Sequence, residues 1–500
     1  MRNDDLKGKY QRINKIPEEG YLETDAQELE RKILKDTEIA AKDSLSMYAN
    51  GSCAKPGTNP HDISLKANDL AQRISNPNAV DREMFKGSAN REKDVISMIS
   101  RLFEKDDHDD IEAGYILSGG TESLNQASYM LRNKFFMENL DVNVRNLGIG
   151  QALFEASKYR LDKGKGLLKP RIIIPPNYHF AGTKGTDLLG LGTNSLSHYY
   201  LDKNFDIDEN SLREVIKEVY EEGNDIMYAL AVAGDTMHGK VHDVRKLSDV
   251  LNEMSEKYDR KKVPIIVDAA GSFMFLGVMK GNPKYGIAVP EVSFKIPNVE
   301  AIVGDPHKQP LPYGCGLLML KDMSLANYTD VRNITGTNYL DMDEHNKDTT
   351  AALATIPTSR SGSNAFAIWA YLVYQGMSGL RREKENIWSL VKDFREFVDK
   401  SKNYELVCEP QTQVVSFRYK GSGSDNVELY RRIKKSDKDF CYVSHDTGML
   451  VRSKEEMARS EKAEELAGLF ITVMEHSKPE HMDRLKERLE EEAYLMRNNR

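Results

Sequence analysis

The chain has 500 residues, of which 40% are hydrophobic and 30% are charged, and its formal net charge is −8. This length exceeds the usual domain size of about 100–200 residues, so we expect either several domains or one large α/β body. No basic segment stands out, which argues against a nucleic-acid-binding protein. No apolar run reaches the roughly 18 residues of a membrane span. The 4 cysteines lack C-x-x-C spacing, which argues against disulfides or zinc and favours the cytoplasm.

The N-terminal part is expected to form an arm followed by a loop. Residues 1–45 are rich in charge and show weak helical periodicity, as in a surface helix that needs a partner. The segment from Cys53 to His61 is dominated by glycine, proline and small residues, which is typical of loops that line sites. A helix is predicted over 91–103 from the spacing of its apolar residues.

From residue 91 to about residue 375, short apolar runs alternate with helical patterns. Strands are predicted at 115–117, 171–174, 227–232, 264–267, 299–303 and 317–320, with helices at 122–136, 209–221 and 244–257. This alternation predicts an α/β fold whose mostly parallel sheet is covered by helices on both faces. Ligands of such sheets bind at the carboxyl ends of the strands.

The C-terminal part is predicted to be a smaller α+β domain. A long helix begins at Asn364, strands are expected at 414–419 and 469–474, and a charged helix begins at Glu480. The Gly-Ser segment 421–424 is interpreted as a flexible turn. These patterns divide the chain into an arm with a site-lining loop (1–90), a large domain (91–385) and a small domain (386–500).

The first candidate ligand-binding motif is SGGTES at 118–123, which links a strand to a helix. Glycines let a ligand approach the backbone, and the free N–H groups of the helix start attract phosphate, with Thr121 as an added donor. The segment is not a P-loop because it lacks the Gly-Lys-Ser/Thr ending. An ordinary capped turn is the alternative interpretation.

Three further strand ends are also polar. His179 follows the strand 171–174 and could stack on a flat cofactor or exchange a proton, although a packed structural histidine is the alternative. Thr236 lies in GDTMHG after the strand 227–232. Asp268 ends the strand 264–267 beside Ala270, and a buried carboxylate there needs a cationic partner.

The last strand end provides a lysine. Residues 304–308 read GDPHK after the strand 299–303. Lys308 is either a surface lysine or an amine nucleophile held at the end of a buried strand. A Schiff-base lysine, an aspartate for a protonated pyridine and a phosphate cradle together form the set of groups that binds pyridoxal 5'-phosphate (PLP).

In their order along the chain, these motifs resemble the group II PLP-dependent amino-acid decarboxylases, and most of all archaeal tyrosine/aspartate decarboxylases. The resemblance spans about residues 45–375 and rests on SGGTES, His179 with Lys184, GDTMHG, VDAA, GDPHK and TSRSG (358–362). It implies a type I PLP-dependent transferase fold of the aspartate aminotransferase kind. The same superfamily contains sphingosine-phosphate lyase.

The resemblance also implies roles for single residues. Lys308 would form the Schiff base with PLP, Asp268 would pair with the pyridine nitrogen, and His179 would stack on the ring. Other residues would surround the cofactor. Gly120, Thr121 and His307 would lie near its phosphate, Ala270 would lie on the ring face opposite His179, and Thr236 would place a hydroxyl near the cofactor.

Two residues are implied to act on the substrate. Arg360 would hold its carboxylate, and Tyr339, on a mobile loop, would return a proton, with Tyr328 as the competing candidate. The expected reaction converts an acidic or aromatic L-amino acid to the amine and carbon dioxide. A carbon–carbon lyase of the sphingosine-phosphate lyase type and a catalytically silent PLP-fold protein are the alternatives. The resemblance also implies a homodimer with sites at the interface.

The sequence departs from the family pattern at three places. Gly271-Ser272-Phe273 replaces an aromatic-Gly-Gly sequence, Gly185 replaces alanine, and the segment 280–300 is interpreted as an insertion. We expect these departures near the substrate pocket, where they would bear on the choice of amino acid.

Overall fold

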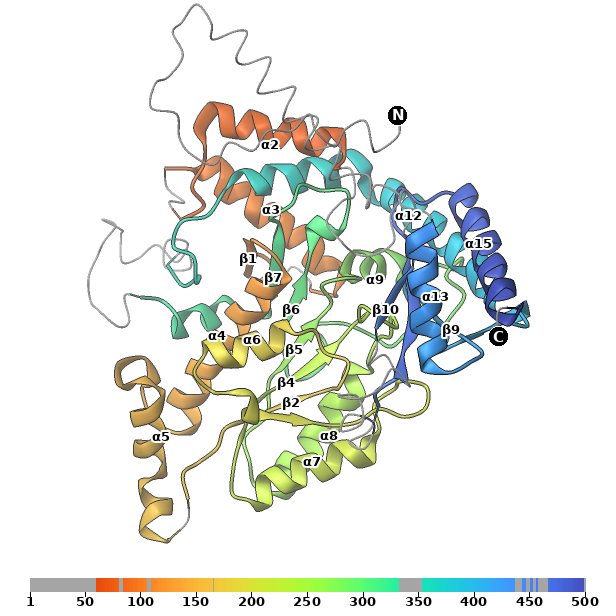
Figure 1. Ribbon diagram of the computed structural model, residues 1–500. Helices are drawn as coiled ribbons and strands as arrows, with labels where there is room; N and C mark the ends of the chain where they lie inside the picture. Colours follow the sequence, from red (N-terminus) through yellow and green to blue (C-terminus); the bar gives the residue numbers. More distant parts are fainter. Residues whose placement is uncertain are drawn as a thin grey trace, which may run out of the picture.

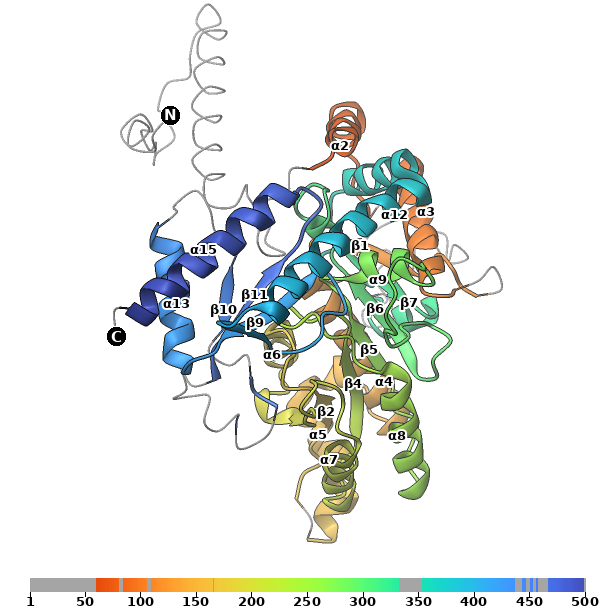
Figure 2. The ribbon, with the colours of Figure 1, turned by 90° about the vertical axis from the view of Figure 1, so that its right-hand side faces the viewer.

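The computed structural model describes residues 60–80, 84–105, 109–164, 166–331, 353–436, 443–446, 450–452, 456 and 466–498. Within these ranges the chain forms a seven-stranded sheet and a four-stranded sheet, and Figures 1 and 2 show the smaller sheet beside the larger one. No helix in the described ranges is both long and apolar enough to cross a membrane.

The larger sheet is mostly parallel, as predicted. Its strand order is β1-β7-β6-β5-β4-β2-β3, and only β7 runs antiparallel to its neighbours. The strands are β1 (Gly114–Leu117), β2 (Arg171–Ile174), β3 (Leu196–His198), β4 (Ile226–Val232), β5 (Ile265–Asp268), β6 (Val299–Gly304) and β7 (Gly316–Leu320). Because β2, β4, β5 and β6 run parallel, their carboxyl ends meet at one edge of the sheet.

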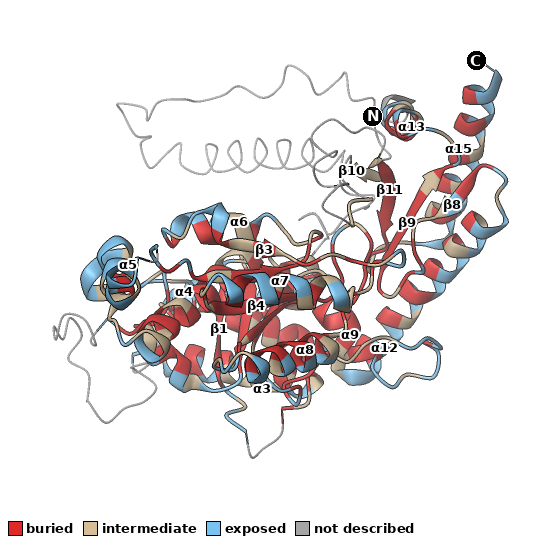
Figure 3. Cartoon of the chain, turned by 90° about the horizontal axis from the view of Figure 1, so that it is seen from below, coloured by how far each residue is buried: buried red, intermediate tan, exposed pale blue. Residues whose placement is uncertain are grey.

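Helices cover both faces of this sheet, so its strands are buried on either side (Figure 3). One apolar core joins the sheet to α3 (Lys86–Leu102), α7 (Glu209–Glu221), α8 (Val244–Lys257), α9 (Phe273–Met279) and the first half of α12 (Ser363–Lys400). The other core joins it to α4 (Gly120–Asn139), α5 (Val144–Asp162) and α6 (Ala181–Leu188). Helix α2 (Asp62–Ser75) packs on α12.

The smaller sheet has the order β10-β11-β9-β8 and is antiparallel. Its strands are β8 (Tyr404–Leu406), β9 (Val414–Tyr419), β10 (Ser444–Asp446) and β11 (Gly468–Thr472), and its helices are α13 (Gly423–Ser436) and α15 (Pro479–Asn498). A separate apolar core forms here with the second half of α12. The interpretation of 421–424 as a turn alone was wrong, since α13 begins at Gly423 and Asp425 accepts a hydrogen bond from the Ser422 amide.

Candidate active site

A cavity of about 380 Å³ lies where the carboxyl ends of the parallel strands meet. Residues after β2, β4, β5 and β6 line it, together with the start of α4 and residues from β10 and β11. Seven of the predicted site residues line this one cavity: Gly120, Thr121, His179, Thr236, Asp268, Ala270 and Lys308. They come from positions up to 188 residues apart, and the parallel sheet explains why they meet.

Lys308 ends a short 3₁₀ turn (Pro306–Lys308) that follows β6. Proline at the first position of this turn fixes the backbone as it leaves the strand. The Lys308 ammonium lies 3.1 Å from Oδ2 of Asp305, and the lysine side chain is 18% exposed. The other oxygen of Asp305 accepts a hydrogen bond from the Gly120 amide. The lysine is therefore held at the cavity wall by a carboxylate that is itself fixed.

Asp268 is the last residue of β5 and is buried. Its Oδ1 accepts a hydrogen bond from the Ala270 amide at 3.1 Å. Burial raises the pKa of Asp268, while the Ala270 N–H, Lys308 and His179 act in the opposite direction. A buried carboxylate with a raised pKa gains most from a cation placed beside it.

His179 lies in the turn between β2 and α6. Its Nδ1 accepts a hydrogen bond from the Ala181 amide at 3.2 Å, which orients the ring, and its ring centroid lies 3.9 Å from that of Phe180. Burial lowers the pKa of His179. The side chain therefore presents a flat, neutral imidazole to the cavity at pH 7.

The start of α4 is shaped for a close approach. A Cβ added at Gly120 would lie 2.8 Å from the Asp305 carboxylate and 3.1 Å from the Ala270 methyl group, so only glycine fits there. Thr121, the next residue, also lines the cavity. The first N–H groups of a helix attract anions, so this end of the cavity suits a phosphate group.

These residues fit PLP by their chemistry. Lys308 offers a primary amine, Asp268 a buried carboxylate that a pyridinium would stabilise, and His179 a flat ring. The glycine-rich start of α4 offers backbone donors for a phosphate. When bound, PLP would supply an aldehyde for the lysine amine and a ring that accepts electrons.

Two other predicted residues need separate comment. His307 does not line the cavity, and its Nδ1 is hydrogen-bonded to the Cys315 carbonyl at 2.8 Å. Its ring does lie against Gly119, since a Cβ there would be 3.2 Å from the imidazole, so it adjoins the start of α4. Tyr339 lies outside the described residues.

Neither Arg360 nor Tyr328 is among the residues that line the cavity. The Arg360 guanidinium lies 2.7 Å from the buried Glu92 carboxylate on α3 and also donates to the Ile116 carbonyl at 2.8 Å. The Tyr328 hydroxyl donates to Glu138, near the opposite edge of the sheet. Both groups therefore have partners within the protein, although the buried Arg360 Nε has no hydrogen-bond partner among the described residues. No local pattern indicates these distant partners.

Two of the departures from the family pattern now have structural explanations. A Cβ at Gly185 would lie 2.7 Å from the Asn125 side-chain oxygen, so Asn125 on α4 fills the space of an alanine methyl group. The insertion does not line the cavity, contrary to expectation. Instead, the Tyr285 carbonyl accepts a hydrogen bond from the Trp388 indole, which ties the insertion to α12.

Sequence reasoning also missed several residues that line the cavity. Asp305 is part of GDPHK, and its position three residues before Lys308 was a usable signal. Phe180 follows His179 directly. His445 and Phe470 come from the small domain, and no local pattern connects them with the strand ends of the large domain.

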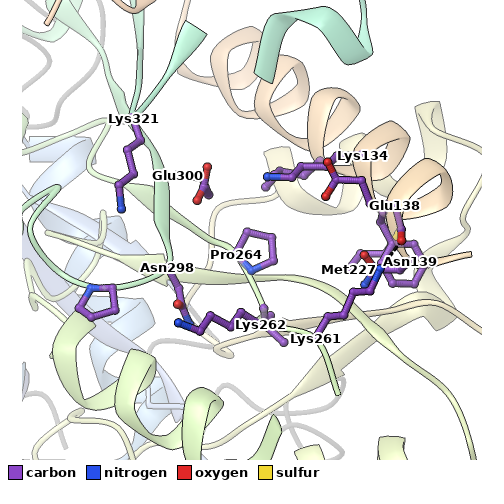
Figure 4. A pocket seen from close by; sticks show the side chains of 14 residues that line it. Lys134, Glu138, Asn139, Met227, Lys261, Lys262, Pro264, Asn298, Glu300 and Lys321 are labelled. Carbon is purple, nitrogen blue, oxygen red and sulfur yellow. Dashed lines mark hydrogen bonds between the residues drawn. The ribbon is translucent and has the colours of Figure 1, made fainter. Parts of the chain in front are cut away.

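A larger cavity of about 480 Å³ lies at the opposite edge of the sheet (Figure 4). Its charged lining residues are Lys134, Glu138, Lys261, Lys262, Glu300 and Lys321. The Lys261 ammonium there donates to the Glu138 carbonyl. None of the predicted site residues lines it, so the 380 Å³ cavity is the candidate active site.

Comparisons with known proteins agree with this assignment of the cofactor. The family model of the pyridoxal-dependent decarboxylase conserved domain matches residues 167–420. The chain is 28% identical over 349 residues to a probable L-tyrosine/L-aspartate decarboxylase of Methanothermobacter thermautotrophicus, covering 69% of this chain and 77% of that protein. It is 26% identical over 379 residues to the L-aspartate/L-glutamate decarboxylase of Pyrococcus horikoshii, covering 75% and 81%.

Solved structures share the fold. Mouse CSAD superposes with a TM-score of 0.75 at 17% identity, covering 98% of this chain and 91% of that one. Sphingosine-1-phosphate lyase of Burkholderia pseudomallei superposes with a TM-score of 0.69 at 17% identity, covering 97% and 93%. The fold is therefore the predicted type I PLP-dependent fold. The strand-end chemistry and the family match lead to one conclusion: the chain belongs to the pyridoxal-dependent decarboxylase family and is a PLP-dependent carboxy-lyase.

Proposed function

We propose that this protein decarboxylates an acidic or aromatic L-amino acid, such as aspartate, glutamate or tyrosine, to the amine and carbon dioxide. The observation that carries the proposal is the meeting of Lys308, Asp268 and His179 in one cavity. Aspartate is the first substrate to test, because both relatives named above bear it in their names.

Each residue has a proposed task. Lys308 provides the amine that holds PLP covalently and gives way to the substrate amine. Asp268 keeps the ring nitrogen protonated, and His179 stacks on the ring, with Ala270 on its other face. Bound PLP would supply a ring able to take up the electron pair of the bond between Cα and the carboxylate.

Other residues are proposed to bind the cofactor more peripherally. Gly120 leaves room for the phosphate to approach, Thr121 contributes N–H and hydroxyl donors, and His307 supports that end of the site through its packing on Gly119. Thr236 lines the same cavity, which supports a role for its hydroxyl near the cofactor. Tyr339 stays the predicted donor of the proton that returns to Cα.

The test of the cofactor site is spectroscopic. Purified protein supplied with PLP should absorb as a yellow Schiff base, borohydride should abolish that band, and Lys308→Ala should lack it. Lys184→Ala is the matched control, since Lys184 lies over the Phe180 ring beside the cavity and should not alter the band. A colourless wild-type protein that takes up no PLP would overturn the proposal.

The test of the reaction measures carbon dioxide from aspartate, glutamate and tyrosine. Release from one of them supports decarboxylation. An aldehyde formed from a phosphorylated amino alcohol without carbon dioxide would instead indicate a carbon–carbon lyase. PLP uptake without either product would indicate a catalytically silent protein.

We also propose a cytoplasmic homodimer. Large apolar side chains are exposed on α2 and α12, which pack on each other: Leu65, Leu70, Ile74, Val373 and Tyr374. Such a patch is typical of a protein–protein interface. The described cysteines Cys315 and Cys408 are free thiols, which is compatible with a reducing compartment. Sedimentation at micromolar concentration should give the dimer mass, and a monomer would contradict the proposal.

A further inference from the structure

A fully buried lysine lies on α12, behind the turn that carries Lys308. Lys384 is 1% exposed, and its ammonium donates to the side-chain oxygen of Gln309 at 2.6 Å and to the carboxylate of Glu475. A buried ion pair of this kind contributes little net stability, because the desolvation of both charges offsets their attraction. The position of Lys384 therefore indicates a role other than stabilising the fold.

Gln309 connects this lysine to the candidate Schiff-base residue. It directly follows Lys308, is 3% exposed, and its side-chain Nε2 donates to the Lys308 carbonyl at 3.2 Å. Its amide group is thus held at both ends, by Lys384 at the oxygen and by Lys308 at the nitrogen. The Gln309 backbone N–H also donates to Pro306, which closes the turn.

Glu475 connects the same lysine to the small domain. It lies just beyond β11, where the Val473 amide donates to the Gln413 carbonyl at 2.8 Å. The Gln413 side chain in turn donates to the carbonyl of Gly271, which lines the cavity. Lys384 therefore lies where α12, the Lys308 turn and the small domain meet.

We infer that Lys384 is a positioning residue: acting through Gln309, it fixes the backbone of Lys308 and joins that backbone to the small domain through Glu475. The inference rests on the proposed role of Lys308 in binding PLP. Formation and exchange of a Schiff base require the amine within bonding reach, and a displacement of about 1 Å costs on the order of a hundredfold in such reactions. Even a small shift of the turn should therefore change Schiff-base formation by a measurable amount.

Gln309→Met is the sharpest test, because it removes both side-chain hydrogen bonds but leaves Lys384 paired with Glu475. In protein without PLP, hydrogen–deuterium exchange should accelerate at the amides of Lys308 and Gln309, which close the turn. With PLP, the dissociation constant should rise by about tenfold or more, and the pH midpoint of the Schiff-base band should shift. Lys384→Met should act in the same direction.

Lys105→Met is the matched control. Lys105 is another buried lysine and is 2% exposed. Its ammonium donates to the carbonyl of Leu320, at the end of β7 that is farther along the chain from the Lys308 turn. Removing the Lys105 ammonium should lower the free energy of unfolding. It should leave the PLP affinity, the Schiff-base absorbance band and the hydrogen–deuterium exchange of the Lys308 turn unchanged.

The outcomes are separable. The wild-type protein could bind PLP while Gln309→Met leaves hydrogen–deuterium exchange, PLP affinity and the Schiff-base absorbance band unchanged. In that case the positioning role of Lys384 is wrong while the proposed function stands. Equal changes in Lys105→Met would also overturn it, since they would reflect general destabilisation. A wild-type protein that takes up no PLP would overturn the proposed function and this inference together.

Discussion

The pairing of Arg360 with Glu92 yields the most decisive prediction. Their side chains are only 8% and 2% exposed, and the contact is 2.7 Å long. Arg360→Ala would leave the Glu92 carboxylate buried with the Ile116 amide still donating to it. Removing one partner of a buried ion pair costs about 3–5 kcal/mol, because the remaining charge stays desolvated. This loss is a large share of the free energy of unfolding of a typical domain, which is roughly 5–15 kcal/mol.

Equilibrium unfolding in urea measures this change. Arg360→Ala should lower the midpoint strongly, whereas Arg213→Ala, which breaks an exposed pair with Glu253, should cost less than about 1 kcal/mol. The double variant Glu92→Leu/Arg360→Met should recover much of the loss, because an apolar pair of similar volume can replace a buried ion pair.

The same variants distinguish the structural role of Arg360 from a role in binding the substrate. If Arg360 held the substrate carboxylate, Arg360→Lys would raise KM by about tenfold or more while stability stayed close to that of the wild type. If the pair with Glu92 is the main role, stability falls and KM at saturating PLP changes little. Unchanged stability together with a raised KM would refute the reasoning from the structure.

Three further predictions concern single residues. Asp268→Asn should slow carbon dioxide release and weaken PLP binding by about tenfold to a hundredfold, with an unaltered circular dichroism spectrum, because a neutral amide cannot stabilise a pyridinium as a carboxylate does; an unchanged rate would contradict this role. Burial lowers the pKa of His242 from 6.5 to about 4. As the pH falls, His242 therefore takes up a proton in the unfolded state before it does so in the folded state. The free energy of unfolding, measured in urea, should fall by about 3 kcal/mol between pH 6.5 and pH 4. His242→Gln should flatten that slope, and an equally steep slope in the variant would exclude His242 as its source. Gly185→Ala should destabilise the protein by about 1–3 kcal/mol, because its methyl group would clash with the Asn125 side chain, and Asn125→Ala should relieve the clash; a neutral Gly185→Ala would contradict the packing.

Much of the large domain could be predicted from local pattern. The helices 209–221 and 244–257 were placed without error because each has a full apolar stripe at helical spacing and an aspartate N-cap. Helix α5 was missed, since few of its residues are buried and Gly148 interrupts it with a non-helical backbone. Strand β3 has 3 residues, too few for a period to emerge.

The site followed from sequence only where chemistry and strand position coincide. Asp268 ends an apolar strand, and Lys308 and His179 lie in the loops just beyond two others, so topology alone predicts that they meet. Arg360 could not be placed that way, because Glu92 lies 268 positions earlier and only the fold brings them together. Lys384 looked like one more charged residue on a long helix, and nothing local distinguishes a buried lysine from a solvated one.

The charges of the cavity connect the fold with the choice of cofactor. Asp268 and Asp305 are both buried at its wall, and Lys308 pairs with Asp305. Burial raises the pKa of Asp268 even though Lys308 and His179 act in the opposite direction. We propose that a protonated ring nitrogen is the cation that this buried carboxylate pairs with.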